Sequence, residues 1–231
     1  MDIQNNQQIV SRLTDIKNSL PIGVTLVAVS KTHPADSILA AYNAGQRIFG
    51  ENKVQEMSLK QEQLPQDIEW HFIGHVQKNK IRLMAPYVSV IQGVDSFDSL
   101  EEINRQASRF NRNITCLLQL HIAVEESKFG FVPSECMDML EKGEWKKLGN
   151  ITIGGVMGMA TFTDDKQQVL REFNTLVNFY NAMKDRFFAD DDNFHTISAG
   201  MSEDYNTAIQ AGSNMIRIGS NIFGARDYSK T

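Results

Sequence analysis

Short apolar runs alternate with longer amphipathic segments along almost the whole chain. The first run, over residues 24–31, is rich in β-branched residues and stops at Lys31, and Pro34 follows shortly after it. An apolar run of this length between turn residues is typical of a fully buried strand in a parallel sheet. Pro34 suits the first turn of a following helix, where its missing N–H would have no partner anyway. The pattern therefore predicts a strand that leads directly into a helix.

The same alternation continues toward the end of the chain and predicts eight strands. An amphipathic helix over residues 3–20 precedes the first strand, since Ile9, Leu13 and Ile16 recur at helical spacing, and the longest helix is expected over 166–187. Strands that alternate with helices form a parallel sheet, and eight in this length favour a closed barrel over an open doubly wound sheet. We therefore expect an α/β protein, a single (β/α)8 TIM-type barrel domain over residues 1–231 with an extra N-terminal helix. The predicted strands cover residues 24–31, 47–52, 69–74, 88–94, 114–122, 151–159, 194–199 and 215–223.

Composition narrows the partners that this barrel can have. The 231 residues carry a net charge of -5 without a basic run, so nucleic acid is not an expected partner. We interpret the many charged residues as solvated helix faces. Cys116 and Cys136 lie far apart and are interpreted as reduced thiols of a cytoplasmic protein. The polar N-terminus does not resemble a signal peptide, and no apolar run is long enough to cross a membrane.

Ligands of parallel barrels bind at the carboxyl ends of the strands, so the residues that finish the predicted strands are the candidate site. A lysine at an apolar strand end can lose its proton and attack an aldehyde to form a Schiff base. From this stretch alone, a surface lysine that marks the end of the strand is the more common case, and the rest of the chain must decide. The expected rim residues are Lys31, Asn52, Gly74, Asp95, His121, Met159, Ser198 and the group over 217–220.

Two small-residue turns, at 198–202 and after the last strand, suggest a phosphate-binding corner. Gly219 lets the backbone approach a ligand closely, and Ser220 adds a hydroxyl beside its own N–H. Backbone amides after the last strand of such barrels are a usual place for phosphate. Ordinary tight turns are the alternative interpretation.

Arg217 and Asn52 each allow two interpretations. The apolar neighbours of Arg217 imply a buried strand, and a buried guanidinium needs a partner. That partner could be a ligand acceptor, such as a ring nitrogen or a phosphate, or it could be Asp95 or Glu51. Asn52 could hydrogen-bond a ring hydroxyl or cap the helix that follows it. The five histidines do not show metal-ligand spacing, so no metal site is expected.

Eight segments, in this order, resemble the pyridoxal-phosphate homeostasis proteins, whose fold is similar to the barrel domain of alanine racemase (PLP fold type III). Their order and number make a chance match very improbable. The segments are AVSKT at 28–32, FGENKVQE at 49–56, WHFIGHVQKNK at 70–80, VDS at 94–96, EESKFG at 125–130, GMS at 200–202, RIGS at 217–220 and IFGAR at 222–226.

The resemblance implies that the chain binds pyridoxal 5'-phosphate (PLP). Lys31 would hold it as an internal aldimine, Asn52 would lie at the ring, and Arg217 would face the pyridine nitrogen. The phosphate would be bound by Ser198, Gly219 and Ser220. Three positions depart from the family pattern: Lys53 replaces a tyrosine, Ala199 a methionine and His121 an asparagine.

The resemblance leaves a PLP carrier and an amino-acid racemase as the main hypotheses. An arginine at the pyridine nitrogen weakens the electron sink that carbanion chemistry uses. A racemase also needs a base on each face of its substrate, and alanine racemase takes the second one through a further β-rich domain and a partner subunit. The sequence ends at Thr231, shortly after the eighth predicted strand, so we expect that domain to be absent. We therefore favour a monomeric cytoplasmic protein of vitamin B6 homeostasis that supplies PLP to apo-enzymes, over a racemase or a sugar-aldehyde enzyme.

Overall fold

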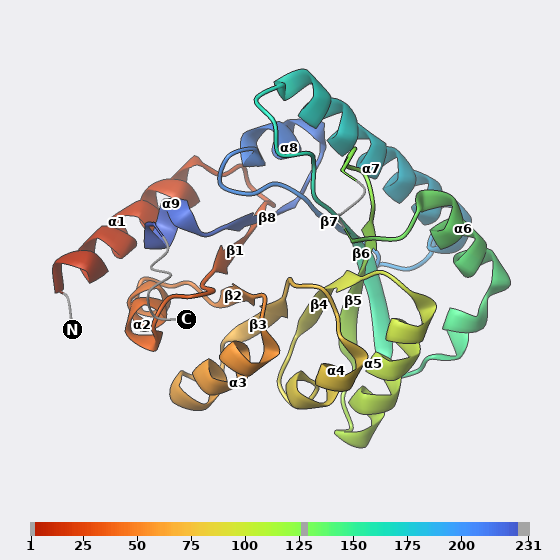
Figure 1. Ribbon diagram of the computed structural model, residues 1–231, viewed down its shortest axis with the longest axis horizontal. Coiled ribbons are helices and arrows are strands. Elements are labelled where there is room, and N and C mark those ends of the chain that lie inside the picture. The colour runs from red at the N-terminus through yellow and green to blue at the C-terminus, as the bar shows by residue number, and fades with distance from the viewer. Residues whose placement is uncertain (1–2, 126–128, 226–231) are drawn as a thin grey trace.

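A closed barrel of eight parallel strands forms the centre of the computed structural model, which describes residues 3–125 and 129–225 (Figure 1). Each strand pairs with the next along the chain, and the last pairs with the first. The predicted (β/α)8 barrel is therefore confirmed. The strands are β1 Thr25–Val29, β2 Ile48–Glu51, β3 Glu69–Phe72, β4 Val90–Val94, β5 Ile114–Leu120, β6 Ile151–Gly158, β7 Thr196–Ser198 and β8 Met215–Ile218.

Helices surround this barrel and bury their apolar faces against it (Figure 1). The predicted bounds of the longest helix, α7, are confirmed to the residue. Within the described residues, no helix has both the length and the apolar content that crossing a lipid bilayer requires. The helices are α1 Ile3–Ser19, α2 Ala35–Asn43, α3 Val54–Gln63, α4 Lys78–Met84, α5 Phe97–Arg109, α6 Pro133–Lys142, the 3-10 turn η1 Glu144–Lys147, α7 Lys166–Phe187, α8 Tyr205–Ala211 and α9 Ser220–Phe223.

The extra N-terminal helix α1 belongs to the outer ring of the barrel. Ile9 and Leu13 are fully buried, as their helical spacing predicts. The helix packs against both α2 and α9, which follow β1 and β8 (Figure 1). It thus lies beside the seam where the first and last strands close the barrel.

The predicted end of the last strand is wrong. The apolar pattern extended it to residue 223, whereas β8 ends at Ile218 and residues 220–223 form the helical turn α9. Ile222 and Phe223 are both buried. An apolar pair that packs inward from a helical turn looks the same in the sequence as the end of a buried strand. The break falls at Gly219, the residue on which the predicted phosphate corner depends.

Gly155 in β6 has a structural role. Its φ of +146° is one that side-chain-bearing residues rarely adopt. A Cβ at this position would lie 1.9 Å from the carbonyl oxygen of Thr196 in β7. Only glycine allows β6 and β7 to approach this closely.

A chain of polar side chains runs from strand to strand among the buried residues. Gln92 lies in the middle and connects His71 with Ser198. Its Nε2 lies 2.9 Å from His71 Nδ1, and its Oε1 accepts a hydrogen bond of 2.7 Å from the Ser198 hydroxyl. Arg217 then donates from Nη1 to Ser198 Oγ at 2.6 Å and from Nη2 to the Gly158 carbonyl at 3.0 Å. Buried polar groups need such partners, and this chain fixes the Arg217 guanidinium near the carboxyl ends of β6 and β7.

His71, at the end of this hydrogen-bonded network opposite to Arg217, is held in its neutral form. Burial alone lowers the pKa of His71 from 6.5 to about 3. The neutral ring can accept the Gln92 N–H at Nδ1, which a protonated ring could not do.

We predict that His71 makes the fold sensitive to acid. Because its pKa is lower in the folded than in the unfolded protein, its contribution to stability is present above pH 6.5 and is lost as the pH falls toward 3. Between these two pH values, the free energy of unfolding falls by up to about 1.4 kcal/mol for each pH unit. Urea unfolding at several pH values should therefore show a shallower acid dependence for His71→Gln than for wild type.

His195→Gln is the matched control, because His195 is exposed. It should retain the wild-type dependence. An unchanged slope in His71→Gln would contradict the buried neutral assignment.

Candidate functional site

The predicted rim residues lie at one mouth of the barrel. All eight strands are parallel, so their carboxyl ends lie at the same end of the structure. Lys31 follows β1 by two residues, Asn52 comes directly after β2, and Ser198 finishes β7. Arg217 lies within β8, and Gly219 and Ser220 follow its end.

The seam between β1 and β8 brings the two ends of the predicted site together. Ala28 pairs with Ile218, so Val29 and Gly219 are the next neighbours across the seam. A Cβ on Gly219 would lie 3.1 Å from the Val29 carbonyl oxygen and 3.3 Å from its Cβ. The absence of a side chain at Gly219 therefore lets the end of β8 approach the end of β1, which Lys31 follows by two residues.

The turns after β7 and β8 meet, as the two predicted small-residue turns require. Gly219 N donates a hydrogen bond of 3.4 Å to Ser202 Oγ, and Asn221 Nδ2 donates one of 3.1 Å to the Ser202 carbonyl. Ser220 is exposed at the start of α9. Ser202 was not among the predicted site residues, although its hydroxyl lies within the turn at 198–202. The corner thus combines backbone N–H groups with the Ser202 and Ser220 hydroxyls, a donor set suited to phosphate.

Ser198 is placed differently from the other predicted phosphate ligands. It is fully buried, and its hydroxyl is engaged by Gln92 and Arg217. In this structure it supports the guanidinium, and its role toward a phosphate stays a prediction.

The interpretation in which Asp95 or Glu51 is the partner of Arg217 is wrong. Asp95 lies 3.2 Å from His75, and Glu51 pairs with Lys60. In the described part of the chain, no carboxylate forms an ion pair with Arg217. Its two hydrogen bonds, to Ser198 and Gly158, use two of the five N–H donors of a guanidinium.

Arg217 nevertheless keeps its positive charge at neutral pH. Burial lowers its pKa to about 10, against a smaller opposing effect of Asp204. A buried cation whose hydrogen bonds go to neutral acceptors is costly, and an acceptor or anion from a ligand would offset that cost. The structure therefore favours the ligand-facing interpretation of Arg217.

Asn52 does not cap the helix that follows it. The N-cap of α3 is Lys53, and no side chain forms a capping hydrogen bond there. The Oδ1 atom of Asn52 is buried and has no hydrogen-bond partner among the described residues. An unpaired buried carbonyl oxygen is unfavourable, and a donor such as a ring hydroxyl would satisfy it.

The three residues predicted to depart from the family pattern follow the ends of β2, β5 and β7. Lys53 is exposed, Ala199 is buried and His121 is half-buried. Parts of two matching segments, residues 126–128 and 226, lie outside the described residues.

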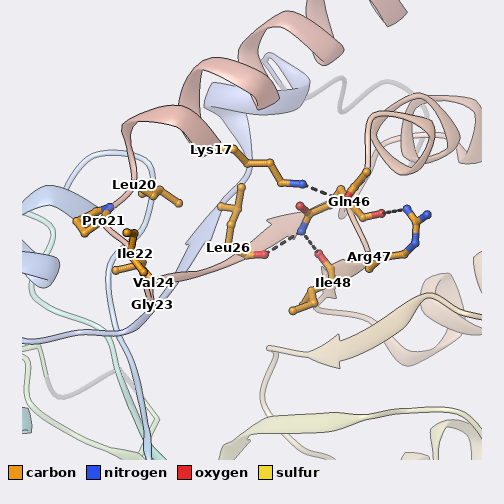
Figure 2. Close-up of a pocket in the computed structure, with 11 residues that line it drawn as sticks. Lys17, Leu20, Pro21, Ile22, Gly23, Val24, Leu26, Gln46, Arg47 and Ile48 are labelled. Carbon is orange, nitrogen blue, oxygen red and sulfur yellow. Dashed lines mark hydrogen bonds between the residues drawn. The ribbon is translucent and has the colours of Figure 1, made fainter.

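A cavity of about 450 Å³ lies at the opposite end of the barrel, near the amino ends of β1 and β2 (Figure 2). Its polar side chains are paired within the chain. Gln46 Nε2 donates to the Leu26 carbonyl at 2.8 Å and to the Ile48 carbonyl at 2.7 Å, joining the starts of the two strands. Lys17 donates to the Gly45 carbonyl at 3.0 Å. These contacts stabilise the end of the barrel where β1 and β2 begin, and they do not indicate a ligand.

In the part of the chain that the structure describes, the cysteines and potential metal ligands do not form a second site. Cys116 and Cys136 are free and buried, and burial raises the pKa of Cys136 to about 12. Among residues 3–125 and 129–225, no three His, Cys, Asp or Glu side chains are placed to hold a metal ion.

Comparison with known proteins identifies the family of this chain. The family model described as the alanine racemase N-terminal domain matches residues 4–227. A pyridoxal phosphate homeostasis protein of Vibrio alginolyticus is 40% identical over 214 residues, which cover 90% of this chain and 89% of that protein. The structure of PipY from Synechococcus elongatus, solved with PLP bound, is 33% identical with a TM-score of 0.85 and covers 94% of this chain and 100% of that one.

A more distant likeness shows the fold alone. An alanine racemase of Clostridium difficile is 17% identical with a TM-score of 0.75, and the match covers 95% of this chain but 56% of the racemase. With the family match over almost the whole chain and 40% identity to a relative of similar length, this chain belongs to the pyridoxal phosphate homeostasis proteins, within the alanine racemase N-terminal domain family.

Proposed function

We propose that this protein binds PLP at the mouth of its barrel, through Lys31, and acts in PLP homeostasis by holding and supplying the cofactor. The observation that carries the proposal is the β1–β8 seam, where the Lys31 turn lies beside the corner built by Gly219 and Ser202. The relative PipY has been solved with PLP bound on the same fold.

The described residues fit the chemical groups of PLP. Backbone N–H groups at Gly219 and Ser220, with the hydroxyls of Ser220 and Ser202, would hold the phosphate. The unpaired Oδ1 of Asn52 would accept from the ring hydroxyl. Arg217, a cation without a carboxylate partner in the described chain, would donate to the ring nitrogen.

When bound, PLP supplies an aldehyde that condenses reversibly with amines. The Lys31 amine would hold it covalently, and the barrel mouth would keep this aldehyde from other amines in the cell. The same reversibility would allow release to an apo-enzyme.

The environment of Arg217 favours a carrier over a racemase. A guanidinium can donate hydrogen bonds but has no acceptor site, and Arg217 stays protonated at neutral pH. Arg217 would therefore leave the ring nitrogen unprotonated, which disfavours carbanion chemistry at the substrate. We further propose that apo PLP-dependent enzymes receive the cofactor and that the protein works as a monomer in the cytoplasm.

We predict that PLP attaches to Lys31. Addition of PLP to the purified protein should produce a visible absorption band that shifts on borohydride reduction, because reduction fixes the attachment. Peptide mass spectrometry should place the reduced adduct on Lys31, and Lys31→Ala should lose it.

Lys53→Ala is the matched control, since Lys53 is exposed and lies next to Asn52. It should retain the adduct. A covalent adduct of the same yield in Lys31→Ala, located on another lysine, would contradict the assignment.

We also predict that the PLP-loaded protein does not racemise amino acids. Incubated with D- or L-alanine in deuterated water, it should exchange the Cα proton no faster than free PLP at the same concentration, with optical activity retained. Exchange at enzyme-like rates that depends on Lys31 would overturn the carrier assignment in favour of a racemase.

A further inference from the structure

A buried ion cluster lies directly behind the turn that carries Lys31. Lys60 is on helix α3, but its side chain is only 8% exposed, and the Glu51 side chain at the end of β2 is fully buried. Lys60 Nζ lies 2.7 Å from Glu51 Oε1 and 2.7 Å from Glu56 Oε1. The interpretation of the many charged residues as solvated helix faces is therefore wrong for Lys60.

The ammonium group of Lys60 uses all of its donors. Its third hydrogen bond, of 2.8 Å, goes to the backbone carbonyl of Ser30. A lysine has three N–H donors, and here they reach β2, α3 and the end of β1. Such complete pairing is what a buried charge requires in order to remain charged.

The cluster contacts both residues that flank Lys31. On one side, the Ser30 hydroxyl donates to Glu51 Oε1 at 2.6 Å. On the other side, the backbone N–H of Thr32 donates to Glu56 Oε1 at 2.5 Å. Lys60 connects these two carboxylates, so the chain on either side of Lys31 is tied to one cation.

Thr32 has a backbone conformation that needs external support. Its φ is +67°, in the left-handed region that a β-branched residue rarely occupies. Its Oγ1 is buried without a hydrogen-bond partner among the described residues. Two hydrogen bonds support this turn: His33 N–H donates to the Ser30 carbonyl at 3.1 Å, and Thr32 N–H donates to Glu56, which Lys60 holds in place.

We propose that Lys60 is a positioning residue for Lys31: through Ser30, Glu51 and Glu56 it fixes the 30–32 turn from which the Lys31 side chain projects. This inference rests on the proposed role of Lys31 in holding PLP. We assign Lys60 no direct contact with the cofactor.

The proposal can be tested by replacing Lys60 with an uncharged residue, because Glu51 can adjust to the loss of that charge. Burial raises the pKa of Glu51 to about 7, and Lys60 acts against this effect. Without Lys60, Glu51 can take up a proton, so the substitution need not leave an unpaired buried charge.

The test compares Lys60→Met with Lys78→Met, a control in which an exposed ion pair with Asp98 is lost. In the ligand-free protein, the Thr32 amide of Lys60→Met should exchange with deuterium about tenfold faster than in wild type, because the protected turn opens. The rate of PLP capture at Lys31 should fall by about tenfold or more, since misplacing a reactive group is costly. Lys78→Met should change neither value.

Rescue separates positioning from general stabilisation. Glycine adopts the left-handed conformation without strain, so Thr32→Gly added to Lys60→Met should restore much of the capture rate. If Lys60→Met does not fold, Glu56→Ala, which removes the Thr32 contact from a more exposed position, should give the same two effects.

Wild-type capture and exchange rates in folded Lys60→Met or Glu56→Ala would overturn the proposal. A lower melting temperature with both rates unchanged would also overturn it, because Lys60 would then act only on stability. If wild-type protein itself failed to attach PLP at Lys31, the proposed function would fail, whereas the exchange of the Thr32 amide would still report on the cluster.

Discussion

The parallel pairing of β1 with β8 is the constraint on which the rest of the site depends. These strands lie at opposite ends of the sequence and are held in register from Thr25–Met215 to Ala28–Ile218. Their pairing closes the barrel, and α1 packs beside the seam against α2 and α9. Because Gly219 has no side chain, the end of β8 lies against Val29, two residues before Lys31. The covalent and phosphate-binding parts of the proposed site are therefore neighbours only in the closed barrel.

Two polar networks support this seam from different directions. In one, neutral groups hold the Arg217 cation: the Ser198 hydroxyl, which Gln92 supports, and the Gly158 carbonyl. The other is an ion cluster in which Lys60 holds the turn around Lys31. Buried hydrogen-bonded networks specify one arrangement of their members, because a half-satisfied alternative is costly. The proposed site is thus built on strand ends and on the turns that directly follow them.

The repeating apolar runs were sufficient to predict the eight strands, their order and the closed barrel, because buried parallel strands have a strong local signal. The last strand end could not be placed, since Ile222 and Phe223 are apolar in either a strand or a helical turn. The position of Arg217 in an apolar strand predicted its burial. Its partners Ser198 and Gly158 lie on other strands, so the sequence around Arg217 does not indicate them.

The Lys60 cluster could not be predicted for a similar reason. Glu56 and Lys60 are four residues apart on a polar helix, which is the usual pattern of an exposed surface pair. Only the packing of α3 against the ends of β1 and β2 brings Glu51 and Ser30 to the same ammonium group. Ser202 was nearer to prediction, because its turn was singled out for its small and hydroxyl-bearing residues.

A crystal structure of the protein loaded with PLP and reduced with borohydride would show which side chain holds the cofactor. We expect continuous electron density from Lys31 Nζ to the cofactor, with the phosphate against the backbone amides of Gly219 and Ser220 and Arg217 toward the ring nitrogen. Density on another lysine, or a Lys31 side chain directed into solvent with the phosphate away from the β1–β8 seam, would contradict it.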